Sequence, residues 1–330
     1  MTIGSAKAPA DCMTTGLFGL TSGSLSTNDL PTGNDRVVRL KNIHLRDIDV
    51  HVVTRCETFA GGLVGSGQNG IYIDNCSVTG VTDTNNVYAG ALYGMDNRVT
   101  TVNCYTLGDV TGFSTNPSKV YLGGLAGQGG GIHLNCYSAG DVVSRQVTGD
   151  VGILNGRSAG ISVQYNSYFN TDALLKQGDT VIAPAKAVGP ITTNATEINV
   201  VSKTAAELKS EAFAAQLNSN ITASSLNAAI DEILKALSGQ DGRGFTQQNY
   251  YEGNKILSWT VKNNTVVFGT ASTDNTTDGS TGGSTGGTAG KDVKSGNTGD
   301  SSNLPLWSAL LLASTVTLTG TVLYKRKRAR

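Results

Sequence analysis

Charge, histidine and tryptophan are scarce in this 330-residue sequence. Charged residues make up 15% of it, and 25 basic and 25 acidic side chains cancel to a formal net charge of zero. Such a balance provides no long-range attraction for nucleic acid. Two tryptophans are too few for a large sugar-binding platform built on that residue, although the 11 tyrosines leave a tyrosine platform open. Low charge combined with 42 glycines is typical of an all-β protein with many turns.

The common enzyme signatures are absent as well. None of the three histidines, His44, His51 and His133, lies in an H-E-x-x-H motif, and we interpret them as ordinary exposed or turn residues. There is no G-x-S-x-G motif and no Walker loop. Asp109 and Asp141 occupy equivalent Gly-Asp-Val positions, where turn carboxylates binding local N–H groups are the ordinary case and a catalytic groove is the alternative. We therefore predict a non-enzymatic protein with no catalytic residue, metal or cofactor.

The N-terminus shows no secretory signal. Met1 is followed by TIGSAKAPADCMTTG, which has neither a basic n-region nor an apolar h-region. Because the other end of the chain indicates export, as described below, we interpret the sequence as a fragment or as one with a misplaced start. In either case a signal would lie further upstream.

A period of about 30 residues governs the segment from 58 to 172. Each of the four copies begins with Gly or Ala followed by Leu or Ile. Each ends with an apolar stretch whose last residues are Asn-Cys or Asn-Ser. The opening pairs are Gly62-Leu63, Ala91-Leu92, Gly124-Leu125 and Gly152-Ile153, and the closing residues are Cys76, Cys104, Cys136 and Ser167. Residues 1–57 hold a weaker copy, from Gly16 to Val50. Repeats of this size bury their apolar faces by stacking, so we predict a β-solenoid.

The cysteines fit this repeat better than a disulfide framework. Five occur, an odd number that includes Cys12 and Cys56, and no C-x-x-C spacing indicates a metal or redox site. Alternation predicts that Ile132, Leu134 and Cys136 share one face, with the cysteines stacked as small buried hydrophobes. The predicted repeat core is Leu63, Cys76, Leu92, Cys104, Leu125, Cys136 and Ile153.

The repeated motif resembles a known bacterial repeat. G-G-L-V-G, a turn, and then I-x-N-C-S/Y-x-x-G-D-V are similar to the GLUG repeat, over about residues 58–170. That repeat occurs in bacterial surface proteins, including the N-terminal regions of IgA-protease-type zinc metallopeptidases. The resemblance implies a β-solenoid stalk or binding surface on a secreted protein and does not imply catalysis. A right-handed parallel β-helix is favoured, with a β-prism or flat stacked sheets as alternatives.

Residues 173–270 are predicted to form a capping region with two helices. No period is visible over 171–202, after which SKTAAELKSEAFAAQLN predicts a helix with a Thr204–Glu207 capping box. ASSLNAAIDEILKALSG predicts a second helix, and the stretch up to Trp259 ends in a short strand. We expect this region to close the end of the solenoid, because an open end exposes apolar core and strand edges. A ligand-binding subdomain is the alternative.

The C-terminal segment has the pattern of a membrane anchor. Residues 271–303 are rich in Gly, Ser and Thr and predict a disordered linker. Residues 304–324 are uncharged and long enough for a single transmembrane helix. The tail at 325–330 is basic, which predicts that it is cytoplasmic and that the rest lies outside. The predicted anchor residues are Leu304, Trp307, Tyr324, Lys325, Arg326, Lys327 and Arg328.

This end also resembles a Gram-positive cell-wall sorting signal. The family pattern is L-P-x-T-G before an apolar span and a basic tail, and Thr298-Gly299 matches its last two positions. Ser295 and Gly296 replace its Leu and Pro. If a sortase acts here, the resemblance implies cleavage between Thr298 and Gly299 and attachment to peptidoglycan. Otherwise the chain stays a single-span membrane protein.

Two functions are compatible with these features. The first is a surface-anchored adhesin or stalk on the extracellular face of a Gram-positive cell, with an unidentified host or matrix protein or glycan as its ligand. The second is the C-terminal anchoring fragment of a larger secreted peptidase or glycan hydrolase, whose catalytic domain lies upstream. The reading frame before Met1 would distinguish them.

Overall fold

The computed structural model describes residues 1–5, 7–11, 14–23, 38–53, 57–85, 87–113, 120–158, 162–190, 195–236 and 256–269. They belong to one compact unit that spans Met1–Thr273. The predicted linker, transmembrane helix, basic tail and sorting motif lie outside the described residues, as do Cys12 and Cys56. Within the described ranges, no helix combines the length and apolar character needed to cross a membrane.

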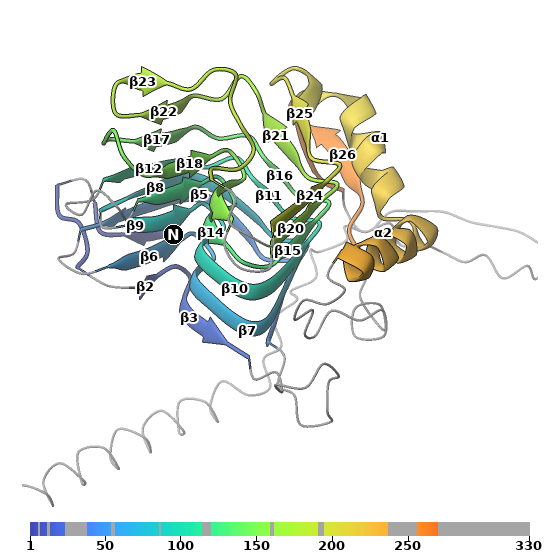
Figure 1. The fold of residues 1–330 in the computed structure, drawn as a ribbon, viewed down its shortest axis with the longest axis horizontal. Coiled ribbons are helices and arrows are strands. Elements are labelled where there is room, and N and C mark those ends of the chain that lie inside the picture. Colours follow the sequence, from blue (N-terminus) through green and yellow to red (C-terminus); the bar gives the residue numbers. More distant parts are fainter. Residues whose placement is uncertain are drawn as a thin grey trace, which may run out of the picture. The chain divides into compact units, whose positions relative to one another are not determined.

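The chain winds through three parallel β-sheets, which we call A, B and C (Figure 1). Each coil crosses sheet B, then sheet C, and then sheet A, and pairs with the next coil in parallel. The described strand pairs that run antiparallel are β22–β23 and β26–β27. The predicted all-β solenoid is therefore confirmed, with two helices beside it.

The strands have the following bounds. Sheet A contains β1 (Thr2–Ile3), β5 (His44–Val52), β8 (Ser77–Asn85), β11 (Tyr105–Thr106), β12 (Asp109–Phe113), β16 (Tyr137–Ser138), β17 (Val142–Ser144), β21 (Tyr168–Asn170), β22 (Leu175–Gln177), β23 (Thr180–Val181) and β25 (Val201–Lys203). Sheet B contains β2 (Thr14–Thr15), β6 (Thr58–Gly61), β9 (Val87–Gly90), β13 (Tyr121–Gly123) and β18 (Asp150–Gly152). Sheet C contains β3 (Phe18–Ser22), β4 (Val38–Lys41), β7 (Val64–Asp74), β10 (Tyr93–Val102), β14 (Ala126–Gly129), β15 (Ile132–Leu134), β19 (Asn155–Ser158), β20 (Ser162–Tyr165) and β24 (Ala195–Ile198). A separate hairpin joins β26 (Trp259–Lys262) to β27 (Thr265–Phe268).

The solenoid extends beyond the four clear repeats in both directions. The weak copy at Gly16–Val50 forms a coil, because β3 and β4 pair with β7, and β5 pairs with β8. On the other side, β24 and β25 pair with β20 and β21. The sequence showed no period there, and this further layer was missed because its strands are short and lack the Gly-Leu opening.

Asparagine forms the corner between sheets C and A in every coil. Six asparagines adopt left-handed backbone angles there, with φ between 47° and 55°: Asn42, Asn75, Asn103, Asn135, Asn166 and Asn199. Asparagine tolerates this conformation better than most residues, because its amide bonds locally. The amides also bond from coil to coil, for example from Asn103 Nδ2 to Asn75 Oδ1 at 2.8 Å and from Asn135 Nδ2 to Asn103 Oδ1 at 2.9 Å. The result is a ladder that sets the register between coils.

The left-handed corner also changes which side chains face inward. Ile132 and Leu134 pack outside sheet C against α2 (Ala223–Ala236), whereas Cys136 lies in the solenoid interior. The prediction that these three share a face is therefore wrong. Asn135 stands between Leu134 and Cys136, and its turned backbone interrupts the strand alternation on which the prediction relied.

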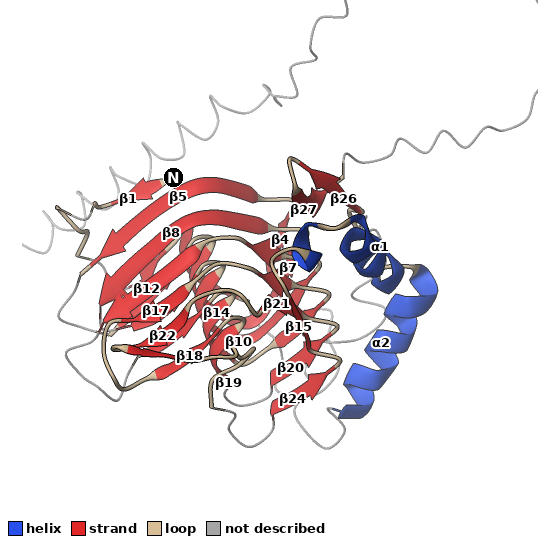
Figure 2. Cartoon of the chain, turned by 90° about the horizontal axis from the view of Figure 1, so that it is seen from above, coloured by secondary structure: helices blue, strands red, loops and turns tan. Residues whose placement is uncertain are grey.

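The two helices lie along the flank of the solenoid (Figure 2). α2 covers outward side chains of several coils of sheet C, including Val102, Leu134 and Tyr165. α1 (Glu211–Asn220) and the β26–β27 hairpin cover the outward tyrosines of sheet A, Tyr105, Tyr137 and Tyr168. The expectation that this region caps the end of the solenoid is therefore wrong in position. The helices instead bury the large side chains on the outer faces of sheets C and A, which would otherwise be exposed to water just as an open end would be.

The first predicted helix is shorter than expected and is interrupted. The Thr204–Glu207 capping box is present, with Glu207 N donating to Thr204 Oγ1 at 3.2 Å and Thr204 N donating to Glu207 Oε2 at 2.7 Å. It starts only the 3₁₀ turn η1 (Glu207–Lys209). Ser210 is extended and begins α1 anew, because its Oγ accepts from Phe213 N at 3.1 Å.

Candidate functional site

Exposed apolar side chains gather on the outer face of sheet A. Of nine large hydrophobic residues that are exposed in the described chain, six belong to the strands of this sheet or to the turns beside them: Val53, Val81, Phe113, Val147, Leu174 and Val181. The interior side of the same strands is fully packed, for example at Val50, Val110 and Val142. We call the outward side of β5, β8, β12, β17 and β22 the open face, since the helices cover the other end of the sheet.

A chain of charged groups crosses the open face from coil to coil. Arg145, which follows β17, donates to the carboxylate of Asp83 on β8. Asp83 in turn lies 3.6 Å from His51 Nδ1, and His51 Nε2 lies 2.7 Å from Asp49 Oδ1. Arg145 is half exposed. Phe113 occupies the equivalent position in the preceding coil, because Gly112 pairs with Ser144. A fixed guanidinium beside an exposed ring is a combination that is enriched in binding surfaces.

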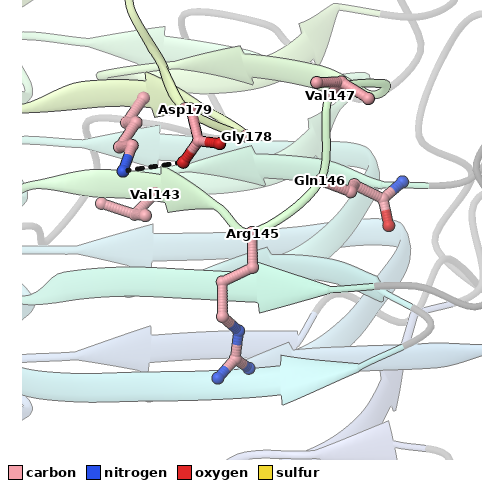
Figure 3. Close-up of a pocket in the computed structure, with 7 residues that line it drawn as sticks. Val143, Arg145, Gln146, Val147, Gly178 and Asp179 are labelled. Carbon is pink, nitrogen blue, oxygen red and sulfur yellow. Dashed lines mark ion pairs between the residues drawn. The ribbon is translucent and has the colours of Figure 1, made fainter.

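A shallow groove of about 380 Å³ opens next to this chain of charges (Figure 3). It is lined by Val143, Arg145, Gln146, Val147, Lys176, Gly178 and Asp179. Figure 3 shows Arg145 extending away across the neighbouring strands, while Lys176 reaches Asp179 at 3.9 Å. The groove therefore offers a ligand the Gln146 amide, the paired charges of Lys176 and Asp179 and an apolar wall, all from two adjacent coils, and the Arg145 guanidinium lies beside it on Asp83.

A second polar cluster is sealed inside the solenoid. His133 is fully buried on β15, and its Nε2 lies 3.0 Å from Asp96 Oδ2 and also contacts the Tyr93 hydroxyl. Its Nδ1 lies 2.6 Å from Gln164 Nε2, and Asp96 accepts from the N–H of Gly130. This histidine is neither exposed nor in a turn, contrary to expectation. Because the cluster is buried, we assign it to stability and coil register.

Electrostatics favour a charged imidazole in that cluster. Burial alone lowers the pKa of His133, but the hydrogen bond that the imidazole donates to Asp96 and the negative charge of Asp96 act in the opposite direction and outweigh burial. The pKa of His133 is therefore raised above its ordinary value. A paired buried charge of this kind is costly to break, since either partner left alone is desolvated without compensation.

The aspartates of the Gly-Asp-Val positions bind between coils. Asp109 Oδ1 accepts from the N–H of Asp141 at 2.9 Å, and Asp141 Oδ1 accepts from the N–H of Leu174 at 2.8 Å. Both carboxylates accept hydrogen bonds from backbone N–H groups, as expected for turn residues. The N–H groups, however, belong to the next coil and not to the same turn. Each is held by one backbone group and does not face the other across a groove.

The residues of the predicted repeat core all lie in one buried cluster. Leu63, Cys76, Leu92, Cys104, Leu125, Cys136 and Ile153 belong to it. Leu125 N donates to Leu154 O, and Gly124 N donates to Ile153 O, so Leu154 stacks under Leu125. The fourth opening pair is therefore Ile153-Leu154, one residue later than the predicted Gly152-Ile153. The predicted anchor and sorting residues, Thr298 and Gly299 among them, lie outside the described residues.

The cysteine column is inaccessible to solvent, which leads to a prediction. Each thiol contacts carbonyls of its own and the previous coil, as Cys104 Sγ does with Val102 O at 3.2 Å, and burial raises the pKa of Cys104. Because all three thiols are buried away from solvent and reagent, we expect the native protein to leave Cys76, Cys104 and Cys136 unalkylated by iodoacetamide. Peptide mass spectrometry, with urea-unfolded protein as control, measures this. Modification of these three sites in the native state would contradict their burial.

The open face itself was missed by sequence reasoning. Its key contact joins Asp83 to Arg145, which are 62 residues apart and belong to non-adjacent coils. The Asn-Cys pairs were recognised as repeat endings, and their regular recurrence is the signal from which the asparagine ladder could have been inferred. No comparable spacing marks Phe113 or Arg145.

We compared the chain with protein families, curated proteins and solved structures. No protein-family model and no curated protein matches it. Among solved structures, it is similar to the crystal structure of "a putative immunoglobulin A1 protease from Bacteroides ovatus", with 18% sequence identity and a TM-score of 0.41. The match covers 63% of this chain and 59% of that one. The chain thus spans less than two thirds of that protein's structure.

Proposed function

We propose that this chain is a non-enzymatic surface protein that displays a ligand-binding face outside a Gram-positive cell. The observation that carries the proposal is the open face of sheet A, where Phe113, Arg145 and the adjacent groove stay uncovered. The titratable groups in the interior are engaged in structure, as Asp96 and His133 are with each other. A rigid solenoid with one exposed, mixed apolar and charged face suits recognition, because its side chains are held in place before a ligand arrives.

Three sequence features support the surface location in this proposal. The repeats resemble the GLUG repeats of bacterial surface proteins, and the segment at 271–303 has the composition of a spacer. The uncharged stretch at 304–324 with its basic tail has the pattern of a membrane anchor. In this proposal, the anchor holds the solenoid at the cell surface and the spacer carries it away from the membrane. Thr298-Gly299 supplies the sorting position if attachment is covalent.

Fractionation of the source cells tests the location. An antibody to residues 58–170 is expected to detect the protein on intact cells, in the membrane fraction or among products released by wall-degrading enzyme. Release only by that enzyme indicates covalent attachment at Thr298-Gly299, and recovery in detergent indicates the 304–324 span. A signal confined to the cytosol would overturn the proposal.

Ligand binding is tested with residues 1–273, the compact unit, on arrays of extracellular-matrix proteins and glycans. We expect at least one ligand to bind at micromolar concentration or better, a binding free energy of about −8 kcal/mol or stronger. Heat-unfolded protein is the control. Arrays without a hit would reduce the proposal to a stalk that only separates other domains from the cell.

A further inference from the structure

A small cavity lies at the end of sheet A that the helices cover. Its volume is about 260 Å³. The sheet contributes Leu107, Tyr137 and Ala139 from two adjacent coils, η1 contributes Leu208, and the β26–β27 hairpin contributes Thr265. Tyr137 and Leu208 are buried, and Leu107 and Ala139 pack against the same apolar cluster. Three parts of the chain that are far apart in sequence therefore meet around a mainly apolar space.

The polar side chains that sheet A presents to this cavity are already hydrogen-bonded. The Tyr137 hydroxyl donates to the carbonyl of Val266 in the hairpin. Asn170 Nδ2 donates to Ala139 O at 3.1 Å, and Asn170 Oδ1 accepts from Asp172 N at 3.0 Å. A ligand with many hydroxyl groups, such as a sugar, would give up its hydrogen bonds to water and find few partners in exchange.

Lys209 is the charged residue of the cavity lining, and it is exposed. Within the described residues, its ammonium group forms no ion pair. The carboxylates on the neighbouring segments are bound elsewhere, since Glu207 Oε2 accepts from Thr204 N at 2.7 Å and Asp172 Oδ2 accepts from Ala205 N at 2.8 Å. The cavity therefore combines an apolar space with one cation that has no anionic partner in the described chain.

We propose that this cavity binds a small carboxylic acid with an apolar body. Its volume is roughly the share of eight or nine water molecules in the liquid, so it accommodates an apolar group of about that many non-hydrogen atoms. The apolar body lies against Leu107, Ala139 and Leu208, and the carboxylate binds the Lys209 ammonium. One lysine is a point charge that suits a carboxylate, whereas the fork of an arginine is the better match for a phosphate.

A medium-chain fatty acid and a large apolar residue at the C-terminus of a peptide share this chemistry. Isothermal titration calorimetry with residues 1–273, which contain the whole lining of the cavity, tests both sources. Octanoate represents the free fatty acid and N-acetyl-leucine represents the peptide terminus. We expect the acid of the correct class to bind with a Kd of about 1 mM or lower, a range that its small size allows. The acid that binds more tightly identifies the source.

Neutral ligands and two variants test the role of the charge. Octanol and the amide of N-acetyl-leucine keep the apolar body without the carboxylate, and we expect each to bind about tenfold more weakly than its acid. Lys209→Ala should weaken the acid by a similar factor and leave the neutral ligand unchanged. Lys262→Ala, which removes an exposed cation of the hairpin that does not line the cavity, is the matched control and should bind like the natural protein.

Ala139→Leu locates the bound ligand. The larger side chain would occupy the cavity and should abolish binding of the acid, while circular dichroism checks that the variant folds. Three outcomes would overturn the proposal: no binding of either acid, equal affinity for an acid and its neutral analogue, or binding that survives both Lys209→Ala and Ala139→Leu. The cavity lies outside the open face, so the result is independent of whether the open face binds a ligand.

Discussion

Replacing Asp96 with alanine is expected to lower the free energy of unfolding by about 3–5 kcal/mol. The variant leaves the imidazole of His133 and the N–H of Gly130 in the solenoid interior without their carboxylate. A buried charge without its partner keeps the desolvation cost and loses the compensation. Urea unfolding followed by circular dichroism measures the change.

Asp179→Ala is the matched control for that variant. Asp179 also pairs with a cation, Lys176 at 3.9 Å, but it is fully exposed. Exposed ion pairs contribute about 0–1 kcal/mol, so this variant should unfold close to the natural protein. Equal destabilisation by the two substitutions would contradict the special role of the buried pair.

The same pair predicts a dependence of stability on pH. The pKa of His133 is raised in the folded protein, so its contribution to stability is complete below the ordinary histidine value and is lost as pH rises through the folded-state pKa. In Asp96→Ala the two largest effects that raise the pKa of His133 are removed, while burial continues to lower it, so we expect the loss of stability with rising pH to be smaller than in the natural protein. Urea unfolding of the two proteins at several pH values between about 5 and 8, where histidine ordinarily titrates, measures how the stability of each depends on pH. Parallel slopes would contradict a charged His133.

Replacing Asn103 with alanine is expected to cost about 5 kcal/mol of unfolding free energy. Its amide bonds Asn75, Asn135 and the Leu257 carbonyl, and its Oδ1 also accepts from Trp259 Nε1 at 2.7 Å. Each bond contributes about 1 kcal/mol. Alanine would also strain the left-handed backbone, which costs about 1–2 kcal/mol. Thermal and urea unfolding measure the loss.

Two variants separate the contributions at this corner. Asn103→Gly removes the hydrogen bonds without the backbone strain and should fall between alanine and the natural residue. Asn199→Ala removes the exposed end of the ladder, where Asn199 Nδ2 donates to Asn166 Oδ1, and it strains the same left-handed backbone, so it should cost about 2–3 kcal/mol. If Asn199→Ala cost as much as Asn103→Ala, the central position of Asn103 between two coils and the hairpin would not matter.

The sequence was sufficient to predict the coils, because each repeat must present the same small and apolar residues at each corner. The spacing of Cys76, Cys104, Cys136 and Ser167 followed from that requirement, and the four residues do stack in the interior. The register at Ile153 was misjudged because GDVGIL offers two apolar residues after a glycine. Only hydrogen bonds between coils decide that Leu154 stacks under Leu125.

Long-range packing was harder to predict. The helices were recognised from their periodicity, but periodicity does not say which surface a helix covers, and the outward tyrosines of sheet A were not identified as that surface. Likewise His133 reads as an ordinary polar residue until Asp96, 37 residues away, is placed beside it. The open face has the same origin, since its residues become neighbours only when non-adjacent coils stack.

The central claim is that the open face binds the ligand, and alanine substitution on that face tests it most directly. Biolayer interferometry would measure the affinity of residues 1–273 for the ligand found on the arrays, in the natural sequence and with Phe113→Ala or Arg145→Ala. Lys262→Ala, an exposed cation on the β26–β27 hairpin, is the control. We predict at least a tenfold loss of affinity for each open-face variant, about 1.4 kcal/mol, and none for the control. Unchanged affinity of both open-face variants would contradict the account.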